Sequence, residues 1–172
     1  MSEFLQIVIL SRDRPLYLQK AIESVLAQNK SDLDFEIIIS DNSEKDDVND
    51  LINKNYLENK KIKYIRRHPQ FSNGSLHTEI VIAELSSKYA VIFHDDDILH
   101  SDYVKKISPF ISDNSISAVC VNAIIFKKTI FDGVKKAHRF NSIKRFNNKK
   151  SFLKQYFLGN GGTAPFPGYM YK

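Results

Sequence analysis

Apolar positions along the chain follow two different periods. Short runs rich in β-branched residues occupy positions 5–10, 35–40 and 89–93, and runs of this length are typical of buried strands. Positions 15–28 instead place apolar side chains at helical spacing. Pro15 suits the first turn of that helix, because its missing N–H would have no intrahelical partner there. The pattern predicts strands that alternate with helices.

The same alternation continues beyond these segments. Pro109 should end or kink the fourth helix, and a loop rich in glycine and proline at 159–168 is expected to have no element after it. The further predicted elements are a polar helix at 48–56, a half-exposed strand at 61–65, a helix at 77–85, a helix at 102–111 and a strand at 117–126.

Strands that alternate with helices indicate βαβ units and therefore the α/β class, with a mainly parallel, Rossmann-like central sheet flanked by helices. Ligands of such sheets gather at the carboxyl ends of the strands. Ser11, Asp41 and the acids Asp95, Asp96 and Asp97 all lie at the ends of predicted strands. We expect these residues to share one edge of the sheet.

Charge is distributed unevenly along the 172 residues. Residues 127–172 contain eleven Lys or Arg and one acid, Asp132, whereas residues 1–126 carry a net charge of about −5. A basic segment can meet nucleic acid, anionic lipid or a phosphorylated ligand, or it can be a solvated face. No aromatic-studded RNA-binding signature accompanies it, so nucleic acid is not expected as a partner.

Cysteine usage and the first residues bear on the compartment. Cys120 lies in the apolar run 118–121, which predicts a buried core thiol and fits a reducing compartment. The apolar run at 4–10 follows Glu3 and is too short for a signal core or a membrane span. A cytoplasmic protein is therefore expected.

The three successive acids are the strongest candidate site. Their mutual repulsion is costly unless a positive group offsets it, and carboxylate oxygens suit divalent cations. Because residues two apart on an extended segment point the same way, Asp95 and Asp97 are expected to converge on one ion, with Asp96 facing elsewhere. Such an ion can grip a diphosphate. The alternative is an exposed acidic turn that caps the helix beginning near Asp102.

Asp41 is a second candidate, because its carboxylate can accept the imide N–H of uracil or a ribose hydroxyl. A simple turn within Asp-Asn-Ser is the alternative interpretation. No glycine-rich loop follows the first strand, which argues against a dinucleotide or Walker-type site. Basic residues near the strand ends can contact phosphate or base, or lie on the surface: Arg12, Arg14, Arg66, Arg67 and His77.

Taken together, several motifs resemble family 2 glycosyltransferases over residues 4–126. The opening resembles that family's strand, Asn-Arg-Pro-like turn and helix, with Asp13 where the family usually has Asn. The motifs are Ile-Val-Ile-Leu-Ser-Arg-Asp-Arg-Pro at 7–15, Ser-Val-Leu-Ala-Gln at 24–28, Glu-Ile-Ile-Ile-Ser-Asp-Asn-Ser at 36–43, Asn-Gly at 73–74 and Phe-His-Asp-Asp-Asp-Ile-Leu at 93–99.

The resemblance implies a GT-A fold, a nucleoside-diphosphate-sugar donor that is often uridine-based, Mn²⁺ or Mg²⁺ as cofactor, and sugar transfer with inversion. It implies a nucleotide-sugar-binding core at 1–126 and a basic, incomplete start of the acceptor-side region at 127–172. The implied acceptor is a glycan or a lipid-linked molecule, and the basic segment would suit docking at the inner face of an anionic membrane.

Carried over to this sequence, the resemblance assigns the base to Asp41 and the metal to Asp97 and then Asp95. Many relatives read Leu-Asp-x-Asp-Asp-Ile-Leu, which aligns their first Asp with His94. The residues that it assigns to the nucleotide sugar are Ser11, Arg12, Arg14, Asp41, Asn73, His77, Asp95 and Asp96.

One element of the family is missing from this sequence. The family's general base is an acid in a Glu-Asp-like motif after the second part of the sheet, and no acid lies between Asp132 and Lys172. Inverting transfer needs a base, so we expect a donor-binding fragment with weak or no transfer. A non-catalytic sugar-nucleotide-binding module is the alternative. A receiver-like phosphoacceptor domain would need an acidic pair after the first strand, where Ser11 and Arg12 stand.

Overall fold

The computed structural model describes residues 4–111, 113–126, 134–136, 143–158 and 168–172. The chain divides into two compact units. Unit 1 comprises Met1–Val119 and Met170–Lys172, and unit 2 comprises Cys120–Tyr169.

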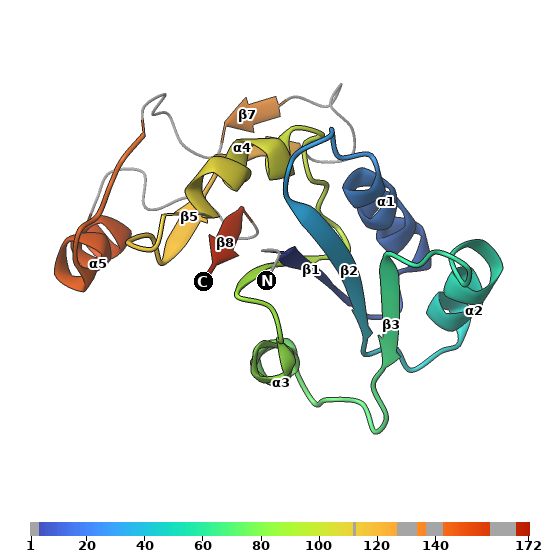
Figure 1. Ribbon diagram of the computed structural model, residues 1–172. Helices are drawn as coiled ribbons and strands as arrows, with labels where there is room; N and C mark the ends of the chain where they lie inside the picture. Colours follow the sequence, from blue (N-terminus) through green and yellow to red (C-terminus); the bar gives the residue numbers. More distant parts are fainter. Residues whose placement is uncertain (1–3, 112, 127–133, 137–142, 159–167) are drawn as a thin grey trace. The chain divides into compact units, whose positions relative to one another are not determined.

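A six-stranded sheet with the order β3-β2-β1-β4-β8-β5 organises the fold (Figure 1). Strands β1 to β4 run parallel, and β8 pairs antiparallel with β4. This arrangement confirms the predicted α/β class with a mainly parallel sheet. The strands are β1 (Phe4–Ser11), β2 (Asp34–Asp41), β3 (Ile62–Arg66), β4 (Tyr89–His94), β5 (Ala118–Cys120) and β8 (Tyr169–Tyr171).

Helices cover both faces of the parallel strands in unit 1. Figure 1 shows α1 and α2 on one side of β1, β2 and β3, and α3 on the other. On the α3 side, Val81 packs with Val8, Leu10, Ile38 and Ile92. The helices of unit 1 are α1 (Pro15–Leu26), α2 (Asp47–Asn55), α3 (Gly74–Glu84) and α4 (Tyr103–Ile111).

The central strand β1 is buried on both faces, as its continuous apolar run predicts. Ile7, Val8 and Ile9 have no solvent-exposed surface, although successive side chains of a strand point to opposite faces. Helix α1 supplies a matching apolar face of Leu18, Ala21, Ile22 and Val25. Burial of this kind is the main favourable term in folding.

Strand register brings polar residues to one edge of the sheet. Ser11 at the end of β1 pairs with Asp41 at the end of β2, and Asp41 pairs with Arg66 at the end of β3. On the other side of β1, Leu10 pairs with His94. Because all four strands are parallel, their carboxyl ends and the loops after them lie together.

Pro109 lies inside α4 and neither ends nor visibly interrupts the helix before Ile111. A proline removes the N–H that would bond to the carbonyl four residues earlier. Here that carbonyl belongs to Lys105, and the hydroxyl of Ser108 donates to it at 3.1 Å. The expected disruption is therefore offset locally, and the helix ends two residues later.

Three expectations about the second half of the chain are wrong. The single strand at 117–126 is two strands, β5 and β6 (Ile124–Phe126), which belong to different sheets. Cys120 is exposed rather than buried, because β5 is a three-residue strand at the edge of its sheet. An element also follows the glycine- and proline-rich segment, since β8 pairs with β4 through Met170 and Val91.

Unit 2 contains an antiparallel pair and a helix. Strand β6 pairs with β7 (Val134–Lys136), and α5 spans Lys149–Leu158. Among the residues that the structure describes, no helix combines the length and the apolar character needed to cross a bilayer.

Truncating the core at β1 should test this packing. We expect Ile9→Ala to lower the free energy of unfolding by about 2–5 kcal/mol, because the side chain is fully buried and its removal leaves a cavity. Leu57, which is 67% exposed, supplies the control, and Leu57→Ala should change stability by about 0.5 kcal/mol or less. Urea unfolding followed by circular dichroism measures both, and equal losses would contradict this account of the core.

Candidate functional site

Asp95 is the most buried acid of the cluster that follows β4, with 1% of its surface exposed. One carboxylate oxygen, Oδ2, accepts hydrogen bonds from the Ser11 hydroxyl at 2.8 Å and from the Arg12 backbone N–H at 3.3 Å. Burial still raises the pKa of Asp95, although the bond from Ser11 and the charge of Arg14 act to lower it. Asp95 therefore connects the end of β4 to the end of β1.

Arg14 provides the positive charge beside this carboxylate. Its Nη2 lies 2.5 Å from Asp95 Oδ1 as an ion pair, but Oδ1 has no hydrogen-bond partner of adequate geometry among the described residues. Its Nη1 donates to Asp96 Oδ2 at 2.9 Å. Arg14 precedes Pro15, the first residue of α1, so the start of this helix holds the guanidinium between two acids.

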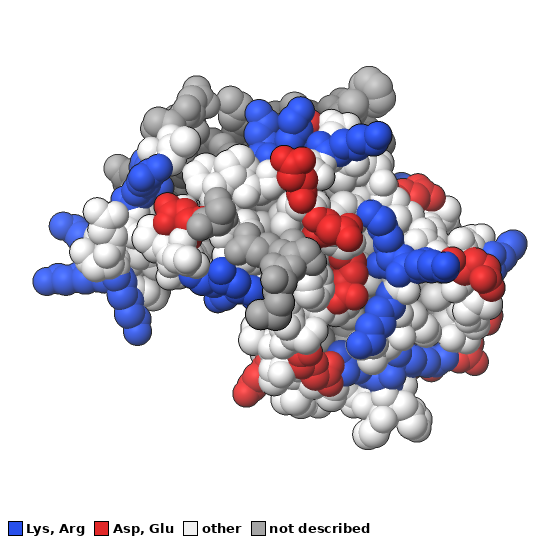
Figure 2. Space-filling view, viewed as in Figure 1, with Lys and Arg blue, Asp and Glu red and all other residues white. Residues whose placement is uncertain are grey.

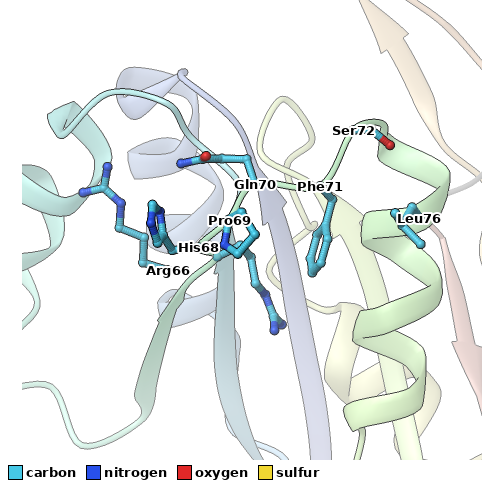
Figure 3. A pocket seen from close by; sticks show the side chains of 8 residues that line it. Arg66, His68, Pro69, Gln70, Phe71, Ser72 and Leu76 are labelled. Atoms are coloured by element: carbon cyan, nitrogen blue, oxygen red, sulfur yellow. The ribbon is translucent and has the colours of Figure 1, made fainter.

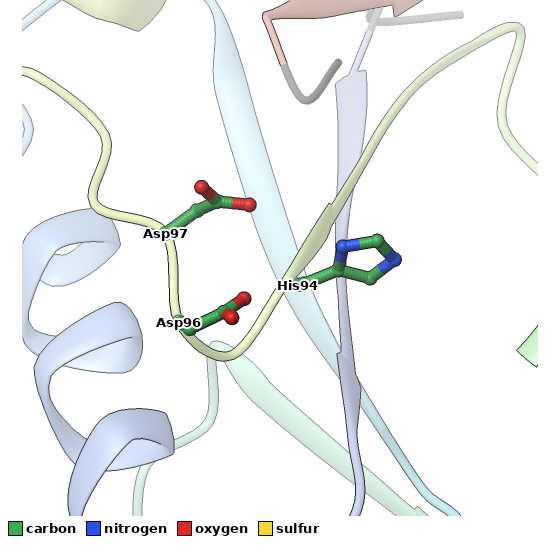
Figure 4. A group of neighbouring side chains, drawn as sticks. All are labelled: His94, Asp96 and Asp97. Carbon is green, nitrogen blue, oxygen red and sulfur yellow. The ribbon is translucent and has the colours of Figure 1, made fainter. Parts of the chain in front are cut away.

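A cluster of possible metal ligands lies beside this ion pair. His94, Asp96 and Asp97 each offer one ligand atom, and these atoms lie within 4.8 Å of one another (Figure 4). His94 belongs to the cluster that the sequence singled out, where it stands at the position of the first Asp of many relatives, but it was not assigned as a metal ligand. Its position directly before three acids was the available signal.

The backbone from Asp95 to Asp97 is not extended, although the expected convergence of Asp95 and Asp97 on one ion assumed that it is. The Asp97 N–H donates to the His94 carbonyl at 3.2 Å, so the segment is a turn and not extended backbone. The alternation of side chains applies only to extended backbone. Asp95 therefore points into the protein, while Asp96 and Asp97 lie on the same side as His94. The assignment of the metal to Asp97 and Asp95 stays a prediction.

The chemistry of this cluster fits a divalent cation. Burial, and then the negative charge of Asp96, raise the pKa of Asp97, so a nearby cation would favour its ionised form. Two carboxylates suit Mn²⁺ or Mg²⁺, and the imidazole of His94 adds a softer nitrogen ligand that favours Mn²⁺.

Asp41 forms a second part of the site at the end of β2, where it is fully buried. Its Oδ1 accepts from the Ser43 N–H at 2.9 Å, and its Oδ2 accepts from the Tyr64 hydroxyl at 2.7 Å. Burial and the bond to Asp41 raise the pKa of Tyr64 well above its usual range. Tyr64 was missed from the sequence, although it alternates with Arg66 on β3, and Arg66 pairs with Asp41.

Neighbouring loops hold Asp41 in place. The Asn42 amide accepts from the Phe71 N–H at 2.7 Å and donates to the Phe71 carbonyl at 3.1 Å. The Ser43 hydroxyl accepts from the Asp13 N–H at 2.7 Å. The carboxylate of Asp13 in turn accepts from the Glu44 N–H at 3.0 Å. The loops after β1, β2 and β3 therefore form one hydrogen-bonded rim.

A pocket of about 490 Å³ lies in the segment between β3 and α3 (Figure 3). This segment is tied to Asp41, because the Arg67 N–H donates to the Asp41 carbonyl at 2.8 Å. The pocket combines a guanidinium, an imidazole and an aromatic ring with polar side chains. Its lining residues are Arg66, Arg67, His68, Pro69, Gln70, Phe71, Ser72 and Leu76.

His77 and Asn73 were both assigned to the nucleotide sugar, and the structure places neither at the acid cluster. Asn73 caps α3 by accepting from the Leu76 N–H at 2.9 Å. His77 is 4% exposed, and its Nε2 lies 2.7 Å from the Ser40 hydroxyl. We find both residues supporting the segment that lines the pocket, and any contact with a ligand stays a prediction.

The environment of His77 favours a neutral ring. Arg67 Nε donates to the Ser40 hydroxyl oxygen at 2.8 Å, and the Ser40 hydroxyl can in turn donate to Nε2 of a neutral His77 ring that carries its proton on Nδ1. Arg67 also forms two bonds to Glu84, at 2.9 and 2.7 Å. Burial, and then the charge of Arg67, lower the pKa of His77 to about 4.

Comparison with known proteins decides the family. The sequence profile described as Glycosyl transferase family 2 matches residues 6–170. This chain belongs to glycosyl transferase family 2. One member of known activity, the GalNAc(5)-diNAcBac-PP-undecaprenol beta-1,3-glucosyltransferase of Campylobacter jejuni subsp. jejuni, is 29% identical over 99 residues, which are 56% of this chain and 31% of that protein.

Solved structures of other glycosyltransferases share the fold. S. aureus TarS 1–349 in complex with UDP-GlcNAc superimposes with a TM-score of 0.67 at 16% identity, covering 98% of this chain and 45% of that one. The mannosyltransferase PcManGT of Pyrobaculum calidifontis, in complex with GDP-Man and Mn²⁺, gives 0.58 at 10% identity, covering 69% and 35%. The expected GT-A fold is confirmed. This family 2 chain spans between about a third and about a half of the length of these relatives.

The pKa of His77 generates a prediction about stability. Because the pKa is about 4 in the folded state and about 6.5 when unfolded, the unfolded chain binds more protons between these values. Stability is therefore fully present above about pH 6.5 and falls as the pH drops towards 4, by roughly 3 kcal/mol.

Urea unfolding at several pH values measures this loss. We expect His77→Gln to be less stable than the parent at pH 7 but to show a shallower loss between pH 6.5 and 4. His68 is exposed, so His68→Gln should retain the parent's slope. Parallel pH profiles for all three proteins would contradict a buried neutral His77.

Proposed function

We propose that this family 2 chain binds a nucleoside-diphosphate-sugar donor, a UDP-sugar, for transfer to a glycan or lipid-linked acceptor. The observation that carries the proposal is the edge formed by the parallel strand ends. There a possible metal cluster follows β4 while a buried carboxylate, Asp41, ends β2, two strands away in the sheet. The fold shared with TarS bound to UDP-GlcNAc and with PcManGT bound to GDP-Man and Mn²⁺ supports it.

The roles of the site residues follow from their chemistry. Asp41 accepts the imide N–H of uracil, with Tyr64 and Ser43 fixing its carboxylate. Arg14 turns a guanidinium towards the diphosphate, and Ser11 and Arg12 help to fix Asp95. A divalent ion held by Asp97 with Asp96 and His94 would stabilise charge on the diphosphate.

The transfer itself is a displacement at the anomeric carbon. An acceptor hydroxyl attacks, the bond from that carbon to the diphosphate oxygen breaks, and the configuration inverts. The nucleoside diphosphate leaves, and the proton of the hydroxyl passes to a general base. We assign donor binding to residues 1–126 and acceptor-side contacts to residues 127–172. The C. jejuni relative, whose name specifies a lipid-linked acceptor, supports a glycan or lipid-linked acceptor.

A second candidate function is a sugar-nucleotide-binding module that performs no transfer. No residue of the site described above is assigned the role of the general base that deprotonation of an acceptor needs, so this candidate stands beside the first. Both candidates bind the donor in the same way. They differ in whether UDP is released from UDP-sugar when an acceptor is added.

Metal-dependent binding of UDP is the first test. With UDP at about a hundred times its Kd in the presence of Mn²⁺, folding should gain about 2.7 kcal/mol, which raises the Tm by about 5–10 °C for a chain of this size. EDTA should remove the shift, and Asp97→Asn should reduce it by more than half. Asp32, an exposed acid in the loop before β2, provides the control Asp32→Asn, which should behave as the parent does. No shift with any nucleoside diphosphate would defeat the proposal.

Recognition of the base is the second test. Asp41→Asn should weaken UDP binding about tenfold or more, because a hydrogen bond to a charged group contributes about 1.5–3 kcal/mol. Because cytosine has no imide N–H, the parent should bind UDP more tightly than CDP. Asp41→Asn should lower this ratio of UDP to CDP affinity.

Isothermal titration calorimetry gives the six dissociation constants, those of UDP and CDP for the parent, Asp41→Asn and Tyr64→Phe. Tyr64→Phe keeps the carboxylate of Asp41 and should keep the preference for UDP, even where absolute affinity falls. If Asp41→Asn and Tyr64→Phe both leave the ratio of UDP to CDP affinity unchanged, Asp41 does not read the base.

A further inference from the structure

Helix α5 exposes apolar and basic side chains on the same face. At helical spacing, Lys149, Leu153 and Phe157 form one row, four residues apart. Phe157 is 73% exposed and Leu153 is 37% exposed. Lys150, Lys154 and Leu158 form the adjacent row, in which Leu158 is 77% exposed. Large apolar side chains at such exposure are unusual enough to mark an interaction surface when they lie together.

The opposite side of α5 is partly covered within unit 2. Ser151, Phe152 and Gln155 are half-buried, and the ring of Phe152 contacts that of Phe146 edge-to-face at 5.7 Å between centroids. These contacts attach the helix to the segment before it. The solvent-exposed side of α5 therefore consists of the two rows defined above, which include Leu153 and Phe157, and Lys154 and Leu158.

This surface is strongly positive. Residues 143–158 contain five Lys or Arg and no acid, and Ile143 at the start of the segment is 78% exposed. Figure 2 shows blue and white side chains over α5 and no red ones there. On the face of unit 1 in the same view, red and blue side chains alternate.

The mixture of residues on one face distinguishes between possible partners. A purely apolar protein surface would bury the lysines without compensation, which is costly. Single-stranded nucleic acid could stack a base on Phe157, but the aliphatic Leu153 and Leu158 would gain little from such a partner. The boundary of an anionic bilayer accepts both, because apolar side chains enter the acyl region while Lys ammonium groups stay at the phosphates.

We propose that α5 docks on the surface of an anionic lipid bilayer. The helix has ten residues and is too short to span the hydrocarbon region, so it lies along the interface. Leu153, Phe157 and Leu158 enter the acyl boundary, and Lys149, Lys150 and Lys154 contact lipid phosphates. The docking surface belongs to unit 2 and shares no residue with the donor site of unit 1, and its test uses no donor, metal or acceptor.

Sedimentation with vesicles tests the proposal. The 172-residue chain should partition onto vesicles of phosphatidylglycerol and phosphatidylcholine and much more weakly onto phosphatidylcholine alone. Replacing Lys149, Lys150 and Lys154 together by Gln should lower the partition coefficient on anionic vesicles roughly a hundredfold, at about fivefold per cation. The matched control replaces the exposed Lys20, Lys30 and Lys54 by Gln, which changes net charge equally and should have little effect.

The exposed apolar side chains of α5 need a variant of their own. Phe157→Ser with Leu158→Ser should lower partitioning about tenfold or more, whereas Leu57→Ser with Ile82→Ser, at exposed positions of unit 1, should not. Circular dichroism and the Tm of each variant establish that it is folded.

Three results would overturn the proposal. The first is no preference for anionic vesicles. The second is an equal loss in the two lysine triples, which would indicate diffuse attraction to the net charge. The third is an unchanged partition coefficient for the variant Phe157→Ser with Leu158→Ser, which would indicate a purely electrostatic interaction. If light scattering instead finds a dimer that the same apolar variant dissociates, the face is occupied by a second copy of this chain.

Discussion

A carboxylate withdrawn from water, that of Asp95, is the feature on which the arrangement of the site depends. Burial of the ionised carboxylate costs desolvation free energy. The Ser11 hydroxyl, the Arg12 N–H and the Arg14 guanidinium offset this cost. These three partners lie at the end of β1 and just before α1. The acid thereby fixes the loop after β4 against the start of the first helix, which turns Asp96 and Asp97 outwards beside His94.

Hydrogen bonds around Asp41 extend this order across the sheet. The Ser43 N–H donates to one of its oxygens and the Tyr64 hydroxyl to the other, and the amide of Asn42 pairs with the backbone of Phe71. Beneath the same segment, Arg67 connects Ser40 to Glu84, and burial, followed by the charge of Arg67, lowers the pKa of His77. Buried hydrogen bonds therefore fix the conformation of the loops that line the site. The parallel strands determine only where these loops begin.

Sequence reasoning recovered the part of this structure that depends on local pattern. Continuous apolar runs were sufficient for β1, β2 and β4, because strands buried on both faces have no other composition. It failed where tertiary context decides. The backbone at Asp95 is a turn and not the extended segment that was predicted, Cys120 is exposed because its strand is a short edge, and β8 returns to β4 from far along the chain. Strand register places Tyr64 beside Asp41, and the packing of α3 places His77 beside Ser40. The sequence of a single segment predicts neither contact.

The backbone of Asp13 has a consequence for how this loop can vary. Its φ of 54° lies in the left-handed region, where few residues other than Gly, Asn and Asp are tolerated. The resemblance to family 2 gave Asn as the common residue here, so Asp is an exchange that stereochemistry allows, and its carboxylate then accepts the N–H groups of Glu44 and Lys45. The positive φ therefore limits which residues can occupy position 13, whichever donor sugar the protein binds.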